Sequence, residues 1–300
     1  MLAQDEPVYS LCVRTKHIVV LCLLAGAATA AWPQVPAAVS TDPPADAAHP
    51  AKMTVLHIPS HGSLINGVAY QPSGAGTHPT LVICHGLPGN EKNLDLAQAV
   101  RRAGWNAITF NYRGSWGSPG NFRFAQNLED APAVLAFLRD PVNAAKLGID
   151  PRRIVLAGHS MGGWVAALTA SKDPGLLGAI LISAADMGRS ADSPRDRAVA
   201  MMAADMEALA GVTAESMADE VRANAKAFRL ENAIPGLVSM PLLVITSNDG
   251  LAPEANALVA AIQAKGGKKI ATKHFATDHS YSDHRIALES EIITWLGGLH

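Results

Sequence analysis

One short motif has the residue types and spacing needed for covalent chemistry. Residues 158–163 read Gly-His-Ser-Met-Gly-Gly, which contains a Gly-x-Ser-x-Gly pattern centred on Ser160. The mainly apolar run from Arg153 to Ala157 predicts a strand before it, and the small residues from Trp164 to Ala170 predict a helix after it. This context is typical of a nucleophile elbow, in which a serine hydroxyl is exposed on a sharp strand-to-helix turn. Ser160 is therefore the candidate nucleophile.

The glycines of this motif suit such a turn. A serine held in a strained backbone conformation needs small neighbours, because a side chain at Gly158 or Gly162 would collide with nearby backbone. The helix that follows would direct backbone N–H groups and the positive end of its dipole toward the reacting centre. A Gly-x-Ser-x-Gly pattern is expected by chance roughly 0.1 times in a chain of this length. The alternative interpretation is that Ser160 is a turn residue with a purely structural role.

Composition and charge limit what the chain can be. With 300 residues, 49% hydrophobic and 17% charged, it suits one sizeable globular domain preceded by a short leader. A formal net charge of −2 gives no basic footprint, so nucleic acid is not expected as a partner. Cys12, Cys22 and Cys84 lack metal-ligand spacing, and no cofactor or zinc motif is present, so neither a metal nor an organic cofactor is implied.

Residues 1–30 are typical of a secretory signal peptide. Basic residues precede an apolar run over residues 18–31, and this run includes an Ala-x-Ala site at 28–30. The run is about fourteen residues long, which is short for a membrane span of about twenty. The sequence therefore predicts export to the periplasm or the extracellular space, with cleavage after Ala30. The alternative is an uncleaved N-terminal anchor, which would be the only contact of this chain with a membrane.

Residues 31–51 and 52–300 differ in composition. The first segment is rich in proline and alanine and is predicted to be an extended linker without a helix or strand. In the second, buried apolar runs alternate with helical periodicity, which predicts an α/β domain with a mostly parallel, doubly wound sheet. The expected strands are 53–58, 63–70, 80–84, 105–110, 153–157, 177–183, 241–246 and 268–274, and the expected helices are 94–103, 128–139, 164–170, 253–265 and 284–296.

The alternation lapses over residues 187–237. This stretch is charged and helix-favouring, and we expect it to form a small helical cap inserted over the site. It contains several methionines, namely Met187, Met201, Met202, Met206 and Met217. They could line an acyl pocket, or they could fill the core of an ordinary pair of helices.

Several motifs in residues 52–300 are similar to those of one family. They are His85-Gly86, Asn111-Tyr112-Arg113-Gly114, the motif at 158–163, Asn248-Asp249 and Asp278-His279. Together they resemble the α/β-hydrolase superfamily, closest to its dienelactone-hydrolase-like and prolyl-oligopeptidase-like branches. The resemblance implies an α/β-hydrolase fold, in which nucleophile, acid and histidine follow one another in this order along the chain.

The resemblance implies that Asp249 is the acid of a catalytic triad. It follows the predicted strand 241–246 and would accept a hydrogen bond from the catalytic imidazole, although an Asx turn or helix cap is the ordinary role of an aspartate here. Two histidines compete for the role of base. His279 follows the last predicted strand, as the histidine of the family does, whereas His284 lies just inside the closing helix, where surface histidines are common. His279 is the favoured base.

The resemblance also assigns the oxyanion hole. Its two donors would be the backbone N–H groups of Leu87 and Met161, aimed where negative charge develops. His85 is expected to order the loop that carries Leu87, and His159 is expected to point away from the nucleophile and to pack. Arg113 is expected to order the next loop, with binding of a substrate carboxylate as the alternative.

These residues predict a secreted serine hydrolase that cleaves carboxylic esters through an acyl-enzyme on Ser160. Its partner would be a small ester or a short acyl or peptide substrate, and no pattern indicates an oligomeric state. One alternative is a serine exopeptidase or an enzyme like acyl-peptide hydrolases. The alternative from a different class is a catalytically silent hydrolase fold used for binding. Dehalogenases and epoxide hydrolases of this fold use an aspartate nucleophile, so Ser160 argues against both.

Overall fold

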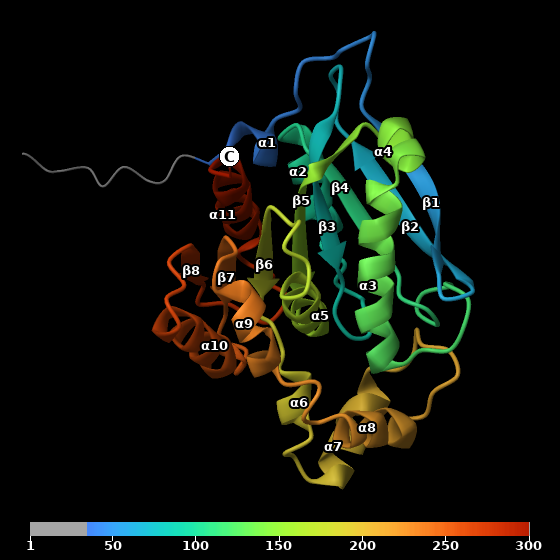
Figure 1. Cartoon of the computed structure of the whole chain (residues 1–300), viewed down its shortest axis with the longest axis vertical. Coiled ribbons are helices and arrows are strands. Elements are labelled where there is room, and N and C mark those ends of the chain that lie inside the picture. The colour runs from blue at the N-terminus through green and yellow to red at the C-terminus, as the bar shows by residue number, and fades with distance from the viewer. Residues whose placement is uncertain (1–34, 300) are drawn as a thin grey trace, which may run out of the picture. The chain divides into compact units, whose positions relative to one another are not determined.

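The structure is a computed structural model and describes residues 35–299. An eight-stranded sheet organises this part of the chain. The strand order is β1-β2-β4-β3-β5-β6-β7-β8 (Figure 1). The pairs β1–β2 and β2–β4 are antiparallel, and all other neighbours in this sheet are parallel. The strands are β1 Lys52–Ser60, β2 Ser63–Gln71, β3 His78–Cys84, β4 Asn106–Phe110, β5 Ile149–His159, β6 Gly178–Ile182, β7 Leu242–Thr246 and β8 Ile270–His274. The predicted α/β class and mostly parallel sheet are confirmed.

The predicted signal peptide lies outside the described residues, as do residues 31–34 of the predicted linker.

Helices cover both faces of the sheet (Figure 1). Those packed on it are α2 Leu94–Arg102, α3 Phe124–Arg139, α5 Met161–Ala170, α10 Ala252–Ala264 and α11 Arg285–Gly297. Every residue of β4, β6 and β7 is buried, because both faces are covered there, and this explains their continuous apolar sequences. In β1 exposed and buried residues largely alternate, because one face is open to solvent.

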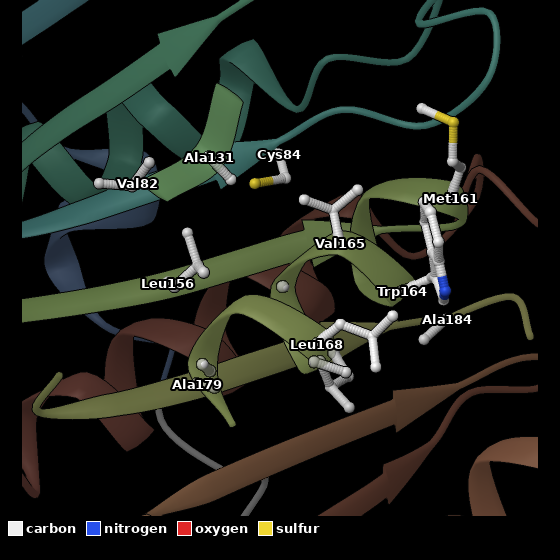
Figure 2. Close-up of a cluster of buried hydrophobic side chains, with 14 of the residues drawn as sticks. Val82, Cys84, Ala131, Leu156, Met161, Trp164, Val165, Leu168, Ala179 and Ala184 are labelled. Carbon is white, nitrogen blue, oxygen red and sulfur yellow. The ribbon is translucent and has the colours of Figure 1, made fainter. Parts of the chain in front are cut away.

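Successive residues of β5 point into two different cores. Leu156 belongs to the core shared with α3, α5 and α10, whereas Val155 belongs to the core shared with α2 and α11. This alternation follows the two-residue period of a strand. Figure 2 shows Val82 and Leu156 of the sheet in the same cluster as Val165 and Leu168 of α5. Every residue of α5 is buried, which accounts for its small and apolar composition.

A group of short helices occupies most of residues 187–237. They are α6 Met187–Ser190, α7 Arg195–Ala204, α8 Ala214–Ala223, the 3₁₀-helix η1 Leu230–Ala233 and α9 Ile234–Leu237. In Figure 1, α6, α7 and α8 lie together below the sheet. The indole Nε1 of Trp164 in α5 donates a hydrogen bond to the carbonyl of Phe228 at 2.7 Å, which links this group of helices to the sheet domain.

The methionines of this region have mainly packing roles. Met187, Met202 and Met217 are buried in the same core as α5, and Met206 packs against that core. Met201 is 48% exposed. Four of the five methionines therefore contact the hydrophobic core.

The expectation that residues 31–51 contain no helix was wrong. A single helical turn, α1 Ala37–Ser40, follows Pro36. Proline is compatible with the start of a helix, where the missing N–H would have no intrahelical partner, and the next proline comes only at Pro43. The guanidinium of Arg102 in α2 donates to the carbonyls of Ala38 at 2.6 Å and Val39 at 3.1 Å, so the turn is held against the domain.

One further helix was missed although its signals are present in the sequence. Helix α4, Pro141–Leu147, has Asp140 as its N-cap, and the carboxylate of Asp140 accepts hydrogen bonds from the N–H groups of Val142 and Asn143. Gly148 ends the helix in a left-handed conformation, with φ of 63°. An N-cap aspartate, a proline at the first helical position and a terminal glycine are standard helix boundaries.

Candidate active site

Ser160 lies on a strained turn between β5 and α5. Its φ of 58° and ψ of −123° are unusual for a residue with a side chain. Its N–H donates to the carbonyl of Ile182 in β6 at 2.9 Å, and its own carbonyl accepts from Gly163 at 2.9 Å. The sheet on one side and the helix on the other therefore hold this conformation, as a nucleophile elbow requires.

The glycines around Ser160 are required by backbone packing. A Cβ added at Gly158 would lie 1.9 Å from the carbonyl oxygen of Gly162. A Cβ added at Gly162 would lie 2.1 Å from the carbonyl oxygen of Cys84, at the end of β3. Both distances are far inside van der Waals contact, so the collision predicted from the sequence is confirmed.

The loop after β3 lies directly against the serine side chain. A Cβ added at Gly86 would lie 3.0 Å from Cβ and 3.5 Å from Oγ of Ser160. Strands β3 and β5 are neighbours in the sheet, with Cys84 opposite Gly158, so the two loops emerge side by side. Leu87 follows Gly86, and Met161 follows Ser160.

The backbone N–H groups of Leu87 and Met161 are available to a ligand. Within residues 35–299, neither group donates a hydrogen bond to a protein acceptor. Met161 is the first residue of α5, so its N–H belongs to the four that a helix leaves without an intrahelical partner. Two such donors beside a serine hydroxyl are suited to binding a developing oxyanion.

His85 organises the loop that carries Leu87. Its ring is buried and donates from Nδ1 to the carbonyl of Gly86 at 2.7 Å. The Tyr112 ring packs edge-on at a centroid distance of 4.7 Å, and the Tyr112 hydroxyl donates to the carbonyl of His85 at 3.3 Å. Burial lowers the pKa of His85 to about 4, so the ring is neutral at physiological pH.

The structure brings Asp249 and His279 together. Asp249 follows β7 and His279 follows β8, and Nδ1 of His279 lies 2.7 Å from Oδ2 of Asp249. The other carboxylate oxygen accepts the N–H of Leu251 at 2.9 Å. The side chain of Asp249 is 4% exposed and that of His279 is 39% exposed, so the acid is shielded while the imidazole can be reached.

Hydrogen bonds hold the carboxyl group of Asp249 in its charged form. Burial by itself would raise the pKa of this group, but hydrogen bonds from His279, the Ser183 hydroxyl and the Leu251 N–H lower it well below its usual range. Asp249 is therefore an anion that accepts a hydrogen bond from Nδ1–H of His279. This arrangement leaves Nε2 of His279 as the ring nitrogen that can accept a proton.

A cluster of buried hydroxyl groups supports Asp249. Ser183 Oγ lies 3.1 Å from Ser247 Oγ and 2.9 Å from the hydroxyl of Tyr281. Ser183 and Tyr281 both have positive φ, at 41° and 58°, which is unusual for residues with side chains. Sequence reasoning missed this cluster, because its members come from three separate segments and belong to no recognisable motif.

The remaining candidates have other partners. His284 Nδ1 lies 2.8 Å from Asp283, and no hydrogen bond joins His284 to Asp249 in the described part of the chain. Arg113 is bound to Asp130 and Glu129, at 2.7 Å and 2.5 Å, so its guanidinium orders the loop after β4.

Two further properties concern ions and membranes. Among residues 35–299, no group of three or more His, Cys, Asp or Glu side chains is arranged to hold a metal ion. Over the same residues, no helix has both the length and the apolar character of a membrane span.

Solved structures of esterases share this fold. The thermophilic carboxylesterase EstE1 from a metagenomic library aligns with a TM-score of 0.63 and 22% identity, over 84% of this chain and 91% of that one. The hyperthermophilic esterase of the archaeon Pyrobaculum calidifontis aligns with a TM-score of 0.61 and 20% identity, over 83% and 86%.

Curated relatives match shorter stretches. An uncharacterized protein of Mycobacterium tuberculosis is 29% identical over 133 residues, which is 44% of this chain and 46% of that protein. The quorum-quenching protein AidA of Acinetobacter baumannii is 33% identical over 110 residues, 35% of this chain and 34% of that protein. The matched stretch thus spans less than half the length of each of these relatives.

The match to a sequence family is longer. A model described as the Alpha/beta hydrolase family matches residues 81–287. This range contains Ser160, Asp249 and His279 and runs from β3 to the first turn of α11. The narrower dienelactone-hydrolase-like or prolyl-oligopeptidase-like branch stays a prediction from the sequence motifs. Because the family match covers more than half of the chain and the sheet has the corresponding fold, the chain belongs to the alpha/beta hydrolase family.

Proposed function

We propose that this protein is a serine hydrolase that cleaves carboxylic esters through an acyl-enzyme on Ser160, with Asp249 as acid and His279 as base. The observation that carries the proposal is the 2.7 Å contact between Asp249 and His279, formed by loops that follow β7 and β8. In a parallel sheet these loops emerge at the same edge as the elbow after β5. The predicted signal peptide adds the proposal that the enzyme acts in the periplasm or outside the cell.

The first half-reaction acylates the serine. Nε2 of His279 takes the proton of Ser160 Oγ as this oxygen attacks the ester carbonyl carbon. The carbonyl π electrons move to oxygen, and the resulting oxyanion is bound by the N–H groups of Leu87 and Met161. The tetrahedral intermediate then collapses, the bond to the alcohol oxygen breaks, and His279 returns the proton to the leaving alcohol. Each oxyanion donor supplies about 3 kcal/mol of transition-state stabilisation.

The second half-reaction releases the acid. A water molecule gives its proton to Nε2 of His279 and attacks the acyl carbon. The same two donors bind the second oxyanion. Collapse breaks the bond to Ser160 Oγ, which recovers its proton from His279, and the carboxylic acid leaves. Throughout, the anionic Asp249 keeps the proton on Nδ1 and stabilises the imidazolium.

The helix and loop geometry supports the same chemistry. The N-terminus of α5 begins directly after Ser160, so its positive dipole end lies where negative charge develops. Gly86 brings the loop of Leu87 into contact with Ser160, and His85 keeps that loop in place. A fold used only for binding would not need Asp249 to be charged, shielded and bonded to a histidine.

Active-site labelling tests the proposal. The purified protein would be treated with a fluorophosphonate and the adduct located by peptide mass, with turnover of a short p-nitrophenyl ester measured in parallel. We expect an adduct on Ser160 and ester hydrolysis, and we expect Ser160→Ala to lose both. Turnover of an aminoacyl anilide in place of the ester would indicate a peptidase. Absence of adduct and of turnover would contradict the proposal and favour a binding protein.

A further inference from the structure

The residue that precedes the candidate nucleophile contacts the candidate base. His159 is the last residue of β5, and its side chain is buried, with 3% of the residue exposed. Its ring lies beside the ring of His279, with centroids 4.6 Å apart and planes inclined at 39°. The mechanism proposed for Ser160, Asp249 and His279 does not use this side chain.

One hydrogen bond defines how His159 acts on its neighbour. Nε2 of His159 lies 2.8 Å from the backbone carbonyl oxygen of His279. A carbonyl oxygen can only accept a hydrogen bond, so Nε2 of His159 carries a proton and donates the hydrogen bond. Nδ1 is then the unprotonated nitrogen, and it has no hydrogen-bond partner among the described residues. The contact thus selects a single tautomer of His159.

His159 does not compete with His279 for the proton that His279 takes from Ser160 in the proposed reaction. Burial, and secondly the neighbouring His279, lower the pKa of His159 to about 4. The other charged groups that act on it are Arg285, which also lowers this pKa, and Asp249, which raises it. The ring therefore stays neutral near physiological pH and can act as a fixed donor.

The backbone of His279 has little support from regular structure. It lies in the segment between β8 and α11, where residues 275–284 belong to no helix or strand. Asp249 holds Nδ1 of the His279 ring, and this fixes one point of the side chain. The contact with His159 fixes the backbone carbonyl of His279 against the end of β5, directly before Ser160.

We propose that His159 is a positioning residue for the base. Its Nε2–H group and its ring hold the backbone of His279 at the end of β5, so that the imidazole keeps one orientation relative to Ser160. This inference rests on the proposed function, because it concerns the same reaction. It predicts an effect on the chemical step rather than on substrate binding.

Two substitutions separate the hydrogen bond from the bulk of the ring. His159→Phe keeps an aromatic ring but removes the donor, whereas His159→Gln keeps an amide donor near the position of Nε2. With a p-nitrophenyl ester we expect His159→Phe to lower kcat by about 10- to 100-fold with little change in KM, because misplaced catalytic groups slow the chemical step. We expect His159→Gln to recover most of this loss. His57→Phe, at an exposed histidine of β1, is the control and should keep wild-type kcat.

The outcomes are distinguishable. Equal kcat for wild type and His159→Phe, or an equal loss in His159→Phe and His159→Gln, would overturn the inference while leaving the proposed function intact. Wild-type protein without ester turnover would overturn the proposed function, and this inference with it. Should His159→Phe fail to fold, ¹⁵N NMR of the wild-type histidine rings decides the contact. We expect the Nε2–H tautomer for His159, and an Nδ1–H tautomer would overturn the inference.

Discussion

Nδ1 of His279 lies 2.7 Å from Oδ2 of Asp249, although the two residues are 30 positions apart in the sequence. The contact joins a shielded carboxylate to an accessible imidazole, with 4% and 39% of the side chains exposed. Such a pair sets the tautomer of the imidazole and stabilises its charged form when it takes up a proton. Substitutions at this pair, and in the elements that place it, should therefore change the activity.

Replacing the acid tests the tautomer directly. Asp249→Asn keeps the shape of the side chain but presents an amide that can donate to His279 Nδ1 and stabilise the wrong tautomer. We expect kcat for a p-nitrophenyl ester to fall by about 10⁴-fold, with the fold retained. The matched control is Asp173→Asn, which removes a half-buried carboxylate paired with Arg139 outside the candidate site. Activity of Asp249→Asn within the range of this control would contradict the role of Asp249.

Replacing each histidine distinguishes the two candidate bases. His279 contacts Asp249, whereas His284 is paired with Asp283. We expect His279→Ala to lower kcat by about 10³-fold, because the reaction loses its proton acceptor. His284→Ala should keep wild-type activity. If the results were reversed, His284 would become the base.

A substitution in the oxyanion loop tests its contact with the serine. In Gly86→Ala the new methyl group would lie 3.0 Å from Ser160 Cβ, tighter than most real contacts, so the serine or the loop must shift. We expect kcat/KM to fall by about 10- to 100-fold, because a displaced donor or nucleophile loses its alignment. Gly297→Ala in α11 is the control, since the added Cβ would point into open space beside its own helix. Equal kcat/KM in the two variants would contradict the proposed contact.

A buried carboxyl group that belongs to none of the sequence motifs is expected to make stability depend on pH. Glu289 in α11 is buried, and burial together with the neighbouring Asp95 raises its pKa from 4.5 to about 7. At pH values between 4.5 and about 7, Glu289 is protonated in the folded protein but has lost its proton in the unfolded chain. The free energy of unfolding therefore contains a contribution from Glu289 that decreases as pH rises through this range.

Urea unfolding at about pH 5 and about pH 8 measures this contribution. The lowered pKa values of His85 and His159 make both wild type and Glu289→Gln gain stability toward the higher pH, because the unfolded chain binds those protons at about pH 5. We expect this gain to be larger in Glu289→Gln than in wild type, because the amide does not titrate and the opposing contribution of Glu289 is removed. Glu291→Gln, two residues along the same helix, should keep the wild-type difference. A wild-type pH dependence retained in Glu289→Gln would show that another group causes it.

The sequence alone determined the features that depend on local patterns. The Gly-x-Ser-x-Gly run, preceded by a strand and followed by a helix, was sufficient to place Ser160 on a strained turn, because the glycines at 158 and 162 admit a backbone approach that no other residue allows. Apolar runs bounded by turn residues likewise indicated the parallel strands. These signals are local because strand period and turn conformation depend on neighbouring residues.

Only the tertiary structure decided which distant side chains meet. Asp249 follows β7, whereas His279 and His284 both follow β8. The pairing of β7 with β8 brings His279 rather than His284 to the acid. The contact of His159 with the His279 backbone has the same origin, since it joins the end of β5 to a loop 120 positions away. Such contacts depend on strand order and on the path of the loops, and no local pattern encodes either.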